Sequence, residues 1–523
     1  MNNRRLPKIF SAAIPGLLLL ATATATGQEP NVLPLAKSYH VGAYSGRTDA
    51  TSSEQELAAT IGELTFQPNG TFAGLIDNYE TNLVTGTIAN LADPVGGTYT
   101  VRGDGIAVLD VDPSNPGTDT APFWITPSGN LIYTATGTSN SQAQTILAIE
   151  TSTGLGNATL SGTYAFERQT IEFVGGVWNV QRSFGTVVFD GAGGANISQT
   201  TTLVTPTATT TSPAATGTET YSVASDGSVS IGGDQGAVTA DGELLFAVLT
   251  GSSGRVGMVI AIRIDTSNTL GDIAGRFGMI SNGFDLDTSA FTPRSRTLSG
   301  SLDFTENSPS IGTWAADGVA VDSRPQGLQS NPITPNTGAA TLLPSSGELT
   351  LAALDSGTAA RVSASGRYLL GSTASTDSSQ LFAARLCSVS NPIGTATAGT
   401  GGIEPLLGMR TFPTLGNASF AFAIENGLGG AFAALPIALA PAPGIPALGG
   451  VLWIDPTAVG TVASALLSGT AGAAGVGSGL SPFAIPANPA LAGFELFAQA
   501  LVFDAAAPGN LAMSRGYRVT LCP

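Results

Sequence analysis

The residues that could carry acid–base or nucleophilic chemistry are few in this chain of 523 residues. His40 is the only histidine, and it follows Tyr39 in an alternating strand near the start of the first repeat. A Ser-His-Asp triad would have to use this histidine, and no Gly-x-Ser-x-Gly elbow lies in a strand-to-helix context. Histidine-based zinc sites fail for the same reason. We therefore expect His40 to be a half-buried strand residue, not a catalytic one.

Paired carboxylates can hydrolyse glycosides without histidine, so the acidic residues form a separate class of candidates. Glu63, Glu243 and Glu348 each begin or flank a strand beside glycine, where we expect exposure. Glu167 and Glu172 share a strand of the second repeat, but their odd separation places them on opposite faces. A glycoside hydrolase would need two carboxylates facing each other within about 10 Å in a cleft, and the sequence gives that alternative little support.

Aspartates in two segments could bind a hard cation. Asp110, Asp112 and Asp119 cluster in a segment rich in Pro, Asn and Gly, and Asp285 and Asp287 form an Asp-x-Asp pair. Oxygen ligands on loops suit calcium. Neither segment has the spacing of an EF-hand or RTX loop, and aspartate is common in turns for backbone reasons. The first three aspartates are the candidate calcium ligands, with a turn role as the alternative.

Two cysteines are present, Cys387 and Cys522. Two distant cysteines and one histidine supply too few ligands for a metal site. In an oxidising compartment the simplest outcome is one disulfide between them. That bridge would enclose roughly 135 residues, for which the loop-entropy model gives an upper value of about 5 kcal/mol.

Charge and the N-terminal segment indicate the compartment. The formal net charge is −17, with 20 basic against 37 acidic residues, which argues against nucleic-acid and anionic-membrane partners. Residues 1–27 have the pattern of a signal peptide: basic residues at positions 4, 5 and 8, an apolar stretch, then small residues. That stretch, about 13 residues long, is too short for a permanent membrane span. We expect a secreted, periplasmic or cell-surface protein with no membrane span in the mature chain.

One pattern recurs three times along the chain, in residues 37–152, 158–266 and 270–388. Each repeat has a Gly-aromatic strand, an alternating strand, an Asp/Asn-Gly turn, a strand, an Asp/Ser-Gly turn and an apolar strand. Asn-Gly and Asp-Gly between alternating runs indicate hairpins. A meander of this length closes into a small barrel or folds over as a sandwich, and closure removes exposed edges. We predict an all-β protein with three tandem antiparallel barrels, or alternatively sandwiches, each with its own core.

Two Pro-containing segments of low apolar content interrupt these repeats. They are Thr200–Thr218 in the second repeat and Asp317–Asn336 in the third. Segments of this composition are typical of loops. We therefore expect both to be long loops.

The amino-acid composition changes in residues 396–523, where Gly and Ala become more frequent. Phe412–Phe420 contains Pro-x-Leu-Gly-Asn, and Leu491–Ala500 contains a Leu-x-Gly and Gln-Ala pattern. With these motifs the segment resembles an uncharacterised β-sandwich domain of exported planctomycete-type bacterial proteins. The resemblance implies a C-terminal β-sandwich and a secreted or envelope protein, and it brings no catalytic residues. The three repeats resemble generic secreted β-repeats.

Two classes of function remain open. The first is a non-catalytic secreted or cell-surface protein with a structural, adhesive or ligand-presenting role, without cofactor, whose partner is a cell-surface polymer or envelope protein. The second is a protein that binds a small ligand or carbohydrate in its barrel mouths, because eight-stranded barrels are just wide enough. The inward-facing residues discriminate: bulky apolar residues indicate packing, whereas small residues with a few polar groups indicate a pocket. The four tryptophans, spread one per domain, suit a core or a barrel mouth; they are Trp124, Trp178, Trp314 and Trp453.

Overall fold

The protein is described by a computed structural model that divides into two compact units, one holding the three repeats and the other Cys387–Pro523. The predicted signal peptide, residues 1–27, lies outside the described residues. The structure describes residues 37–48, 55–67, 69–82, 87–101, 106–110, 120–126, 129–137, 142–174, 177–205, 207–249, 255–265, 268, 273, 275–287, 292–308, 311–324, 327–343, 348–351, 358–373, 379–386, 390–410, 413–488, 491 and 493–522.

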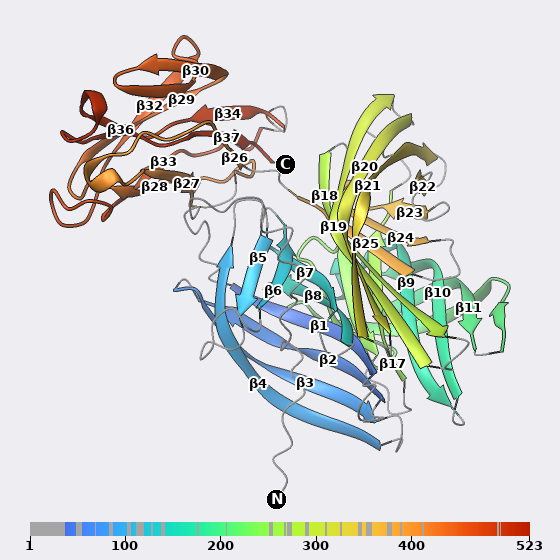
Figure 1. Ribbon diagram of the computed structural model, residues 1–523. Coiled ribbons are helices and arrows are strands. Elements are labelled where there is room, and N and C mark those ends of the chain that lie inside the picture. The colour runs from blue at the N-terminus through green and yellow to red at the C-terminus, as the bar shows by residue number, and fades with distance from the viewer. Residues whose placement is uncertain are drawn as a thin grey trace, which may run out of the picture. The chain divides into compact units, whose positions relative to one another are not determined.

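The first repeat is a closed antiparallel barrel of eight strands in sequence order, coloured blue to teal in Figure 1. Closure comes from β1, which pairs with β2 on one side and with β8 on the other. The strands are β1 (Lys37–Thr48), β2 (Gln55–Phe66), β3 (Thr71–Asn82), β4 (Thr87–Val101), β5 (Ile106–Asp110), β6 (Thr120–Ile125), β7 (Leu131–Gly137) and β8 (Gln142–Glu150).

The second repeat also closes, through the pairing of β10 with β11, and the short β12 adds to β11 outside the ring. The 3-10 turn η1 (Asn157–Thr159) precedes it. Its strands are β9 (Ser161–Val174), β10 (Val177–Asp190), β11 (Gly194–Val204), β12 (Thr209–Thr211), β13 (Ala215–Val223), β14 (Ser228–Ile231), β15 (Asp234–Val238), β16 (Leu244–Leu249) and β17 (Arg255–Arg263).

The third repeat closes by the pairing of β18 with β25. Its strands are β18 (Gly275–Asp287), β19 (Thr292–Ser308), β20 (Ile311–Arg324), β21 (Gly327–Leu343), β22 (Glu348–Leu351), β23 (Thr358–Val362), β24 (Tyr368–Thr373) and β25 (Ser379–Arg385). The prediction of three barrels is confirmed, and the sandwich alternative for the repeats is wrong.

The prediction of long loops within two repeats is also wrong. Thr200–Thr218 falls largely in β11, β12 and β13, and Asp317–Asn336 falls largely in β20 and β21. Threonine is favoured in strands by its β-branched side chain, so a Thr-rich run with few large apolar residues still forms a solvated strand. Pro332 pairs in register with Val319, so a proline is accommodated within the long β20–β21 ladder.

The same aromatic pair closes one end of each barrel. An aromatic residue on the first strand meets a phenylalanine at the end of the second strand edge-on in all three. The ring centroids are 5.4 Å apart for Tyr39 and Phe66, 5.1 Å for Tyr164 and Phe189, and 5.6 Å for Phe277 and Phe304, at interplanar angles of 80°, 89° and 88°. This repeated geometry explains the Gly-aromatic strand that opens each repeat.

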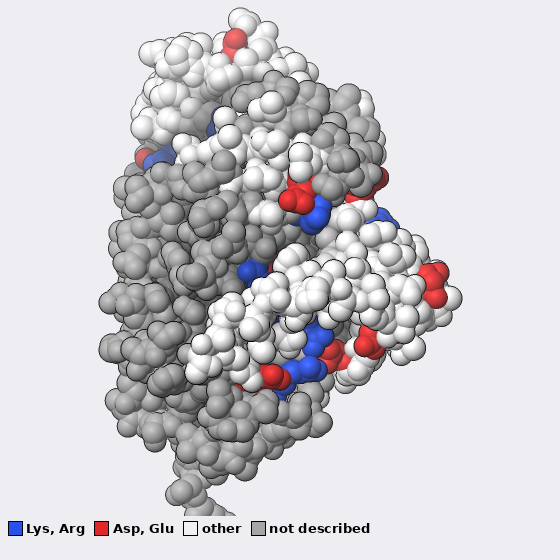
Figure 2. Space-filling model, turned by 90° about the vertical axis from the view of Figure 1, so that its right-hand side faces the viewer, with Lys and Arg blue, Asp and Glu red and all other residues white. Residues whose placement is uncertain are grey.

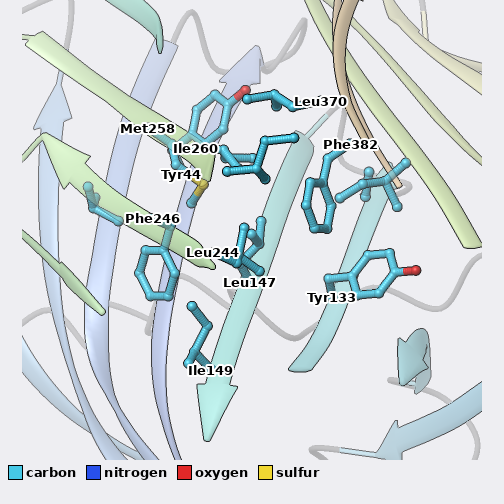
Figure 3. Packing of buried hydrophobic residues seen from close by; sticks show 14 of the residues in the cluster. Tyr44, Tyr133, Leu147, Ile149, Leu244, Phe246, Met258, Ile260, Leu370 and Phe382 are labelled. Atoms are coloured by element: carbon cyan, nitrogen blue, oxygen red, sulfur yellow. The ribbon is translucent and has the colours of Figure 1, made fainter. Parts of the chain in front are cut away.

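A further apolar core lies between the barrels (Figure 3). It collects outward-facing residues from the first and the last strands of all three, among them Tyr133, Phe246 and Phe382. All six residues of β16 are buried, because Leu244, Phe246 and Val248 face this shared core while the alternate residues face the lumen. Because the last strands of each repeat are buried on both faces, their sequences are continuous apolar runs.

The shared core is arranged cyclically. The seventh strand of each barrel packs on the first strand of another: β16 on β1, β7 on β18 and β24 on β9. Glycines permit two of these approaches. A Cβ at Gly278 would lie 2.5 Å from Tyr133 Oη, and one at Gly42 would overlap the Phe246 ring. The three barrels therefore keep separate sheets but form one packed unit.

The C-terminal unit is a β-sandwich, as predicted. A seven-stranded sheet has the order β26-β37-β34-β29-β35-β36 with β32 added to β29, and further sheets are β27-β28-β33 and β30-β31. Its elements are β26 (Ser390–Ile393), η3 (Thr400–Gly402), β27 (Leu406–Met409), β28 (Ala421–Gly427), β29 (Phe432–Ala438), β30 (Pro441–Ala447), β31 (Gly450–Ile454), β32 (Val459–Leu466), β33 (Gly477–Pro482), β34 (Glu495–Ala498), β35 (Leu501–Phe503), η5 (Pro508–Asn510), β36 (Leu511–Met513) and β37 (Gly516–Thr520). Across the described parts of the chain, no helix has the length and apolar character that a membrane crossing requires.

Candidate binding site in the mouth of the second barrel

The described lumen of two barrels is filled by bulky apolar side chains. In the third barrel, Trp314, Phe277 and Met279 are buried in a cluster with leucines from the surrounding strands. In the first, Phe66 stacks on Phe72 and meets Tyr99 edge-on. By the criterion of inward-facing residues, these described side chains indicate packing.

The second barrel also has a buried apolar cluster, and its lumen contains a cavity of about 290 Å³ beside part of that cluster. We call it the mouth cavity. Its apolar floor includes Phe166, Leu245 and Val259. Its polar lining consists of two arginines, two acids and one amide, namely Arg168, Arg255, Glu219, Asp234 and Gln199. An apolar floor with a few polar groups is the composition expected of a small-molecule site.

Strand alternation places the two arginines in the lumen. On β9 the side chains of Phe166 and Arg168 line the mouth cavity, whereas Ala165 belongs to the shared core outside. Arg255 begins β17, the neighbour of β9 in the ring. The two guanidinium groups therefore come from adjacent strands of one wall.

The charges in the mouth cavity are not directly paired. Among the described residues, neither Arg168 nor Arg255 forms an ion pair with Glu219 or Asp234, although all four line one cavity. Arg255 Nε is buried and has no hydrogen-bond partner in the described structure. Burial, and then the charge of Arg255, lower the pKa of Arg168. Burial also raises the pKa of the Asp234 carboxyl, with both guanidinium groups opposing that shift.

A comparison of the three repeats shows that barrel closure does not require an arginine at the position of Arg168. Tyr39, Tyr164 and Phe277 pair with Glu150, Arg263 and Arg385 at the same point of each closing seam. Four residues further along the first strands come Ala43, Arg168 and Ser281, opposite Ile146, Val259 and Leu381. The second barrel therefore carries a guanidinium where the other two carry small residues.

The histidine singled out by sequence lies in β1 and is half-buried, as expected. His40 Nε2 lies 3.1 Å from the carbonyl oxygen of Asp226 and 3.9 Å from its carboxylate. It contributes to the contact between the first and second barrels. No described serine or cysteine nucleophile is hydrogen-bonded to it.

Of the acidic candidates, Glu167 and Glu243 are deeply buried. Glu167 faces outward on β9 and accepts a hydrogen bond from Arg182 Nε at 2.6 Å. Burial raises the pKa of Glu167 to about 7, and Arg182 opposes the shift. The expectation that Glu243 is exposed is wrong, since only 1% of its side chain is accessible. Its turn is pressed against the third barrel.

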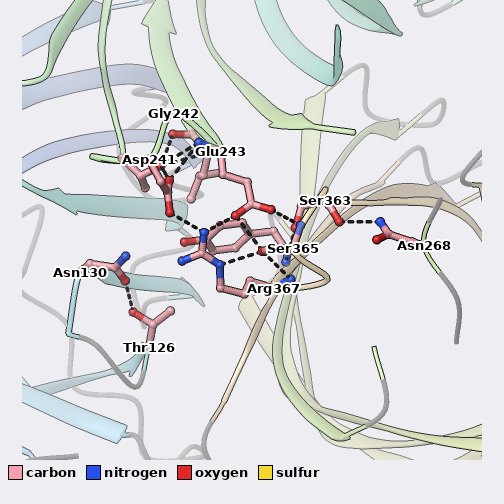
Figure 4. A network of polar contacts seen from close by, with 12 residues as sticks. Thr126, Asn130, Asp241, Gly242, Glu243, Asn268, Ser363, Ser365 and Arg367 are labelled. Atoms are coloured by element: carbon pink, nitrogen blue, oxygen red, sulfur yellow. Dashed lines mark hydrogen bonds and ion pairs between the residues drawn. The ribbon is translucent and has the colours of Figure 1, made fainter. Parts of the chain in front are cut away.

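Glu243 belongs to a polar network between equivalent turns of the barrels (Figure 4). Its carboxylate accepts hydrogen bonds from Ser365 N at 2.6 Å and from Ser365 Oγ at 2.7 Å. Arg367 forms ion pairs with both Asp241 and Glu243. All these acceptors are satisfied by the protein itself, so the network holds two barrels together and leaves no obvious place for a ligand.

These turns share a sequence motif. A hydroxyl residue, two variable residues and a glycine recur at Thr126–Gly129, Thr239–Gly242 and Ser363–Gly366. Each hydroxyl accepts a hydrogen bond from a backbone N–H five residues later, at 3.1, 3.1 and 3.0 Å. Because each turn precedes a seventh strand, the motif sets where each barrel meets its neighbour.

The predicted calcium and disulfide residues are only partly described. Asp110 is buried at the end of β5, whereas Asp112 and Asp119 lie outside the described residues. Within the described residues, no group of three or more His, Cys, Asp or Glu is placed to hold a metal. Cys522 is buried beside Thr414 in a parallel bridge, and Cys387 lies outside the described residues. Both the calcium site and the disulfide stay predictions.

The described tryptophans have packing or bridging roles. Trp314 is buried in the third barrel. Trp124 Nε1 donates to Ser299 Oγ at 3.2 Å between the first and third barrels, and Trp453 Nε1 donates to the Thr395 carbonyl at 2.8 Å. The side chain of Trp178 lies outside the described residues. None of the three described rings lines the mouth cavity.

Charged side chains are sparse on the surface seen in Figure 2, where acidic and basic groups lie near one another among uncharged atoms. No strip of a single sign is visible among the described residues on that face. Specific binding on that face would depend on individual groups, and not on a broad electrostatic field.

No protein-family model matches the chain, and no curated protein matches it. Among solved structures, the chain is similar to the isotype 1 transferrin binding protein B from serogroup B Neisseria meningitidis, with 10% identity and a TM-score of 0.18 over 69% of this chain and 77% of that chain. It is also similar to the Helicobacter pylori beta clamp solved with 3,4-difluorobenzamide, with 6% identity and a TM-score of 0.09 over 68% of this chain and 93% of that chain. At these TM-scores neither similarity carries an argument about function.

Proposed function

We propose that this is a secreted or cell-surface binding protein whose second barrel holds a small organic anion with an apolar part. The observation that carries the proposal is the pair of lumen arginines, Arg168 and Arg255, above an apolar floor without an ion-pair partner among the described residues. The other two barrels supply a rigid packed support through the shared core.

The energetic reason is that a half-buried guanidinium without an ion-pair partner is partly stripped of water, and a bound carboxylate offsets that cost. Arginine presents a planar fork of donors that matches the two oxygens of a carboxylate. Arg255 Nε is a donor left without an acceptor in the mouth cavity. The volume of about 290 Å³ is at the lower end for small-molecule sites, so it suits a compact ligand.

Export and envelope association belong to the same proposal. They are supported by the signal-peptide pattern of residues 1–27 and by the resemblance of residues 396–523 to a domain of exported bacterial proteins. A secreted binding protein would present the mouth cavity outside the cell.

An adhesive role is the second candidate, supported by the C-terminal unit. Its strands β29 and β32 expose large apolar side chains on one face. Phe432, which is exposed, pairs in register with Leu466, and Val462 lies four residues from Leu466 on the same face of β32. Leu466 and Val462 are 75% and 61% exposed. An apolar patch of this kind can mark a contact surface.

The proposal is tested by calorimetric titration of the mature chain, residues 28–523, with hydrocinnamate and with the matched neutral alcohol. We expect saturable binding of the carboxylate, weak binding of the alcohol, and loss of carboxylate binding in Arg168→Ala. That variant installs the residue that the first barrel has at the equivalent position, so we expect it to fold. Absence of carboxylate binding, or equal binding by Arg168→Ala, would contradict the proposal.

A further inference from the structure

The mouth cavity has two chemically different walls. The ring order around the second barrel is β9-β17-β16-β15-β14-β13-β11-β10. Arg168 and Arg255 come from β9 and β17, whereas Glu219 and Asp234 come from β13 and β15. On one side of the ring only β16 lies between β17, which carries Arg255, and β15, which carries Asp234. On the other side β11 and β10 lie between β13 and β9. The lumen therefore carries positive charge on one wall and negative charge on the other.

The acidic wall is held by a tight hairpin. Glu219 lies against the β14–β15 turn, where a Cβ at Gly232 would be 3.0 Å from its Oε2. Gly232 and Gly233 have φ of 57° and 97°, a conformation that favours glycine. Asp234 follows these glycines as the first residue of β15. Both carboxylates are thus brought to one corner of the mouth.

The charge balance argues against a simple anion as the best ligand. Glu172, which pairs in register with Arg255, lies on the same face of β9 as Arg168 and acts on its charge. With Glu219 and Asp234, three acids surround two arginines. A monoanion would add negative charge to this group, whereas a zwitterion would add none and would meet a partner on each wall.

Resting on the function proposed above, we infer that the ligand is a zwitterion with an apolar side chain, namely a hydrophobic amino acid or a short hydrophobic peptide. Its carboxylate is bound by Arg168 and Arg255. Its ammonium group lies toward Asp234 and Glu219, and its side chain contacts the apolar floor around Phe166 and Leu245. The four charged groups, which form no ion pair with one another, then form charge-assisted hydrogen bonds with the ligand.

Three probes with one apolar part test this inference: L-phenylalanine, hydrocinnamate, which lacks the amine, and phenethylamine, which lacks the carboxylate. For the mature chain we expect phenylalanine to bind about tenfold more tightly than hydrocinnamate, the effect of one charge-assisted hydrogen bond. Phenethylamine should bind more weakly than either, because the arginines would stay unpaired.

Single substitutions test which charged residue binds which group of the ligand. Asp234→Asn should remove the preference for phenylalanine over hydrocinnamate, whereas Arg168→Ala should abolish binding of both. Glu63→Gln is the matched control, because Glu63 is exposed on the first barrel, and it should change neither affinity.

The possible outcomes separate the two proposals. Equal affinity for phenylalanine and hydrocinnamate, unchanged in Asp234→Asn, would overturn the zwitterion and leave the anion site standing. Binding of neither carboxylate by the mature chain would overturn both. Stronger binding of phenethylamine than of phenylalanine would overturn the role of the arginines.

Discussion

Tyr133 on β7 of the first barrel donates its hydroxyl hydrogen to the carbonyl oxygens of Gly278 and Ala384 in the third barrel, at 2.9 and 3.2 Å. The ring also meets Phe382 edge-on, with centroids 5.3 Å apart. One side chain thus joins two barrels by a hydrogen bond and by aromatic packing. The barrels of this unit are therefore expected to unfold together, not one at a time.

Adding a methyl group at the Tyr133 contact should destabilise the three-barrel unit. In Gly278→Ala the new Cβ would lie 2.5 Å from Tyr133 Oη and 2.8 Å from Trp124 Cδ2. We expect the free energy of unfolding to fall by about 1–3 kcal/mol, as for other overpacked cores. Thermal and denaturant unfolding followed by circular dichroism measure the change. Gly217→Ala is the control: nothing lies within 4 Å of its Cβ position, so stability should hold or rise.

Breaking the ion pair between the second and third barrels should cost more than breaking an exposed pair. Arg367→Ala leaves the Glu243 carboxylate buried without its charge partner, and we expect a loss of about 3 kcal/mol. Arg361→Ala removes the pair with Glu348, whose members are each about one third exposed, and should cost about 1 kcal/mol or less. Similar losses in the two variants, measured by urea unfolding, would argue against the structural role of the network.

Glu167 should make stability depend on pH. Burial raises its folded-state pKa to about 7 from an ordinary value of 4.5. Between these values the folded state binds more protons than the unfolded state, so the free energy of unfolding falls as pH rises from about 4.5 to 7. Denaturant unfolding at half-unit pH steps measures the slope. In Glu167→Gln this part of the slope should vanish, and a slope that persists unchanged would assign it to other groups.

The predicted bridge between Cys387 and Cys522 should stabilise the C-terminal unit. Mass spectrometry of the unreduced protein should find both cysteines in one linked peptide pair. Reduction should then lower the unfolding temperature of that unit alone, because the loop is long and its closure limits the unfolded chain. Free thiols on both residues of the exported protein would refute the bridge.

The sequence alone could predict the barrels because their signals are local. Hairpin turns such as Asn69-Gly70, and alternation within each strand, act over a few residues. The prediction of a loop at Thr200–Thr218 is wrong because the strands there are solvated and lack the apolar alternation that marks a half-buried sheet. Each ring is closed by the pairing of two strands, and in the first and third barrels these two strands lie far apart in the sequence.

The binding site could not be predicted in the same way. Arg168 and Arg255 are 87 positions apart, and nothing in the sequence of either strand marks its arginine as facing the other. Their approach depends on the pairing of β9 with β17, which closes the second barrel. Comparison with Ala43 and Ser281 would have singled out Arg168, but only once the three repeats are aligned by their strand register. The burial of Glu243 likewise depends on the approach of another barrel.

The most direct measurement is a crystal structure of the mature protein grown with L-phenylalanine. Our account predicts density for the amino acid inside the second barrel, with its carboxylate at Arg168 and Arg255 and its ring over the apolar floor. An empty lumen at saturating phenylalanine, or a lumen in which each arginine is paired with a neighbouring acid, would contradict it.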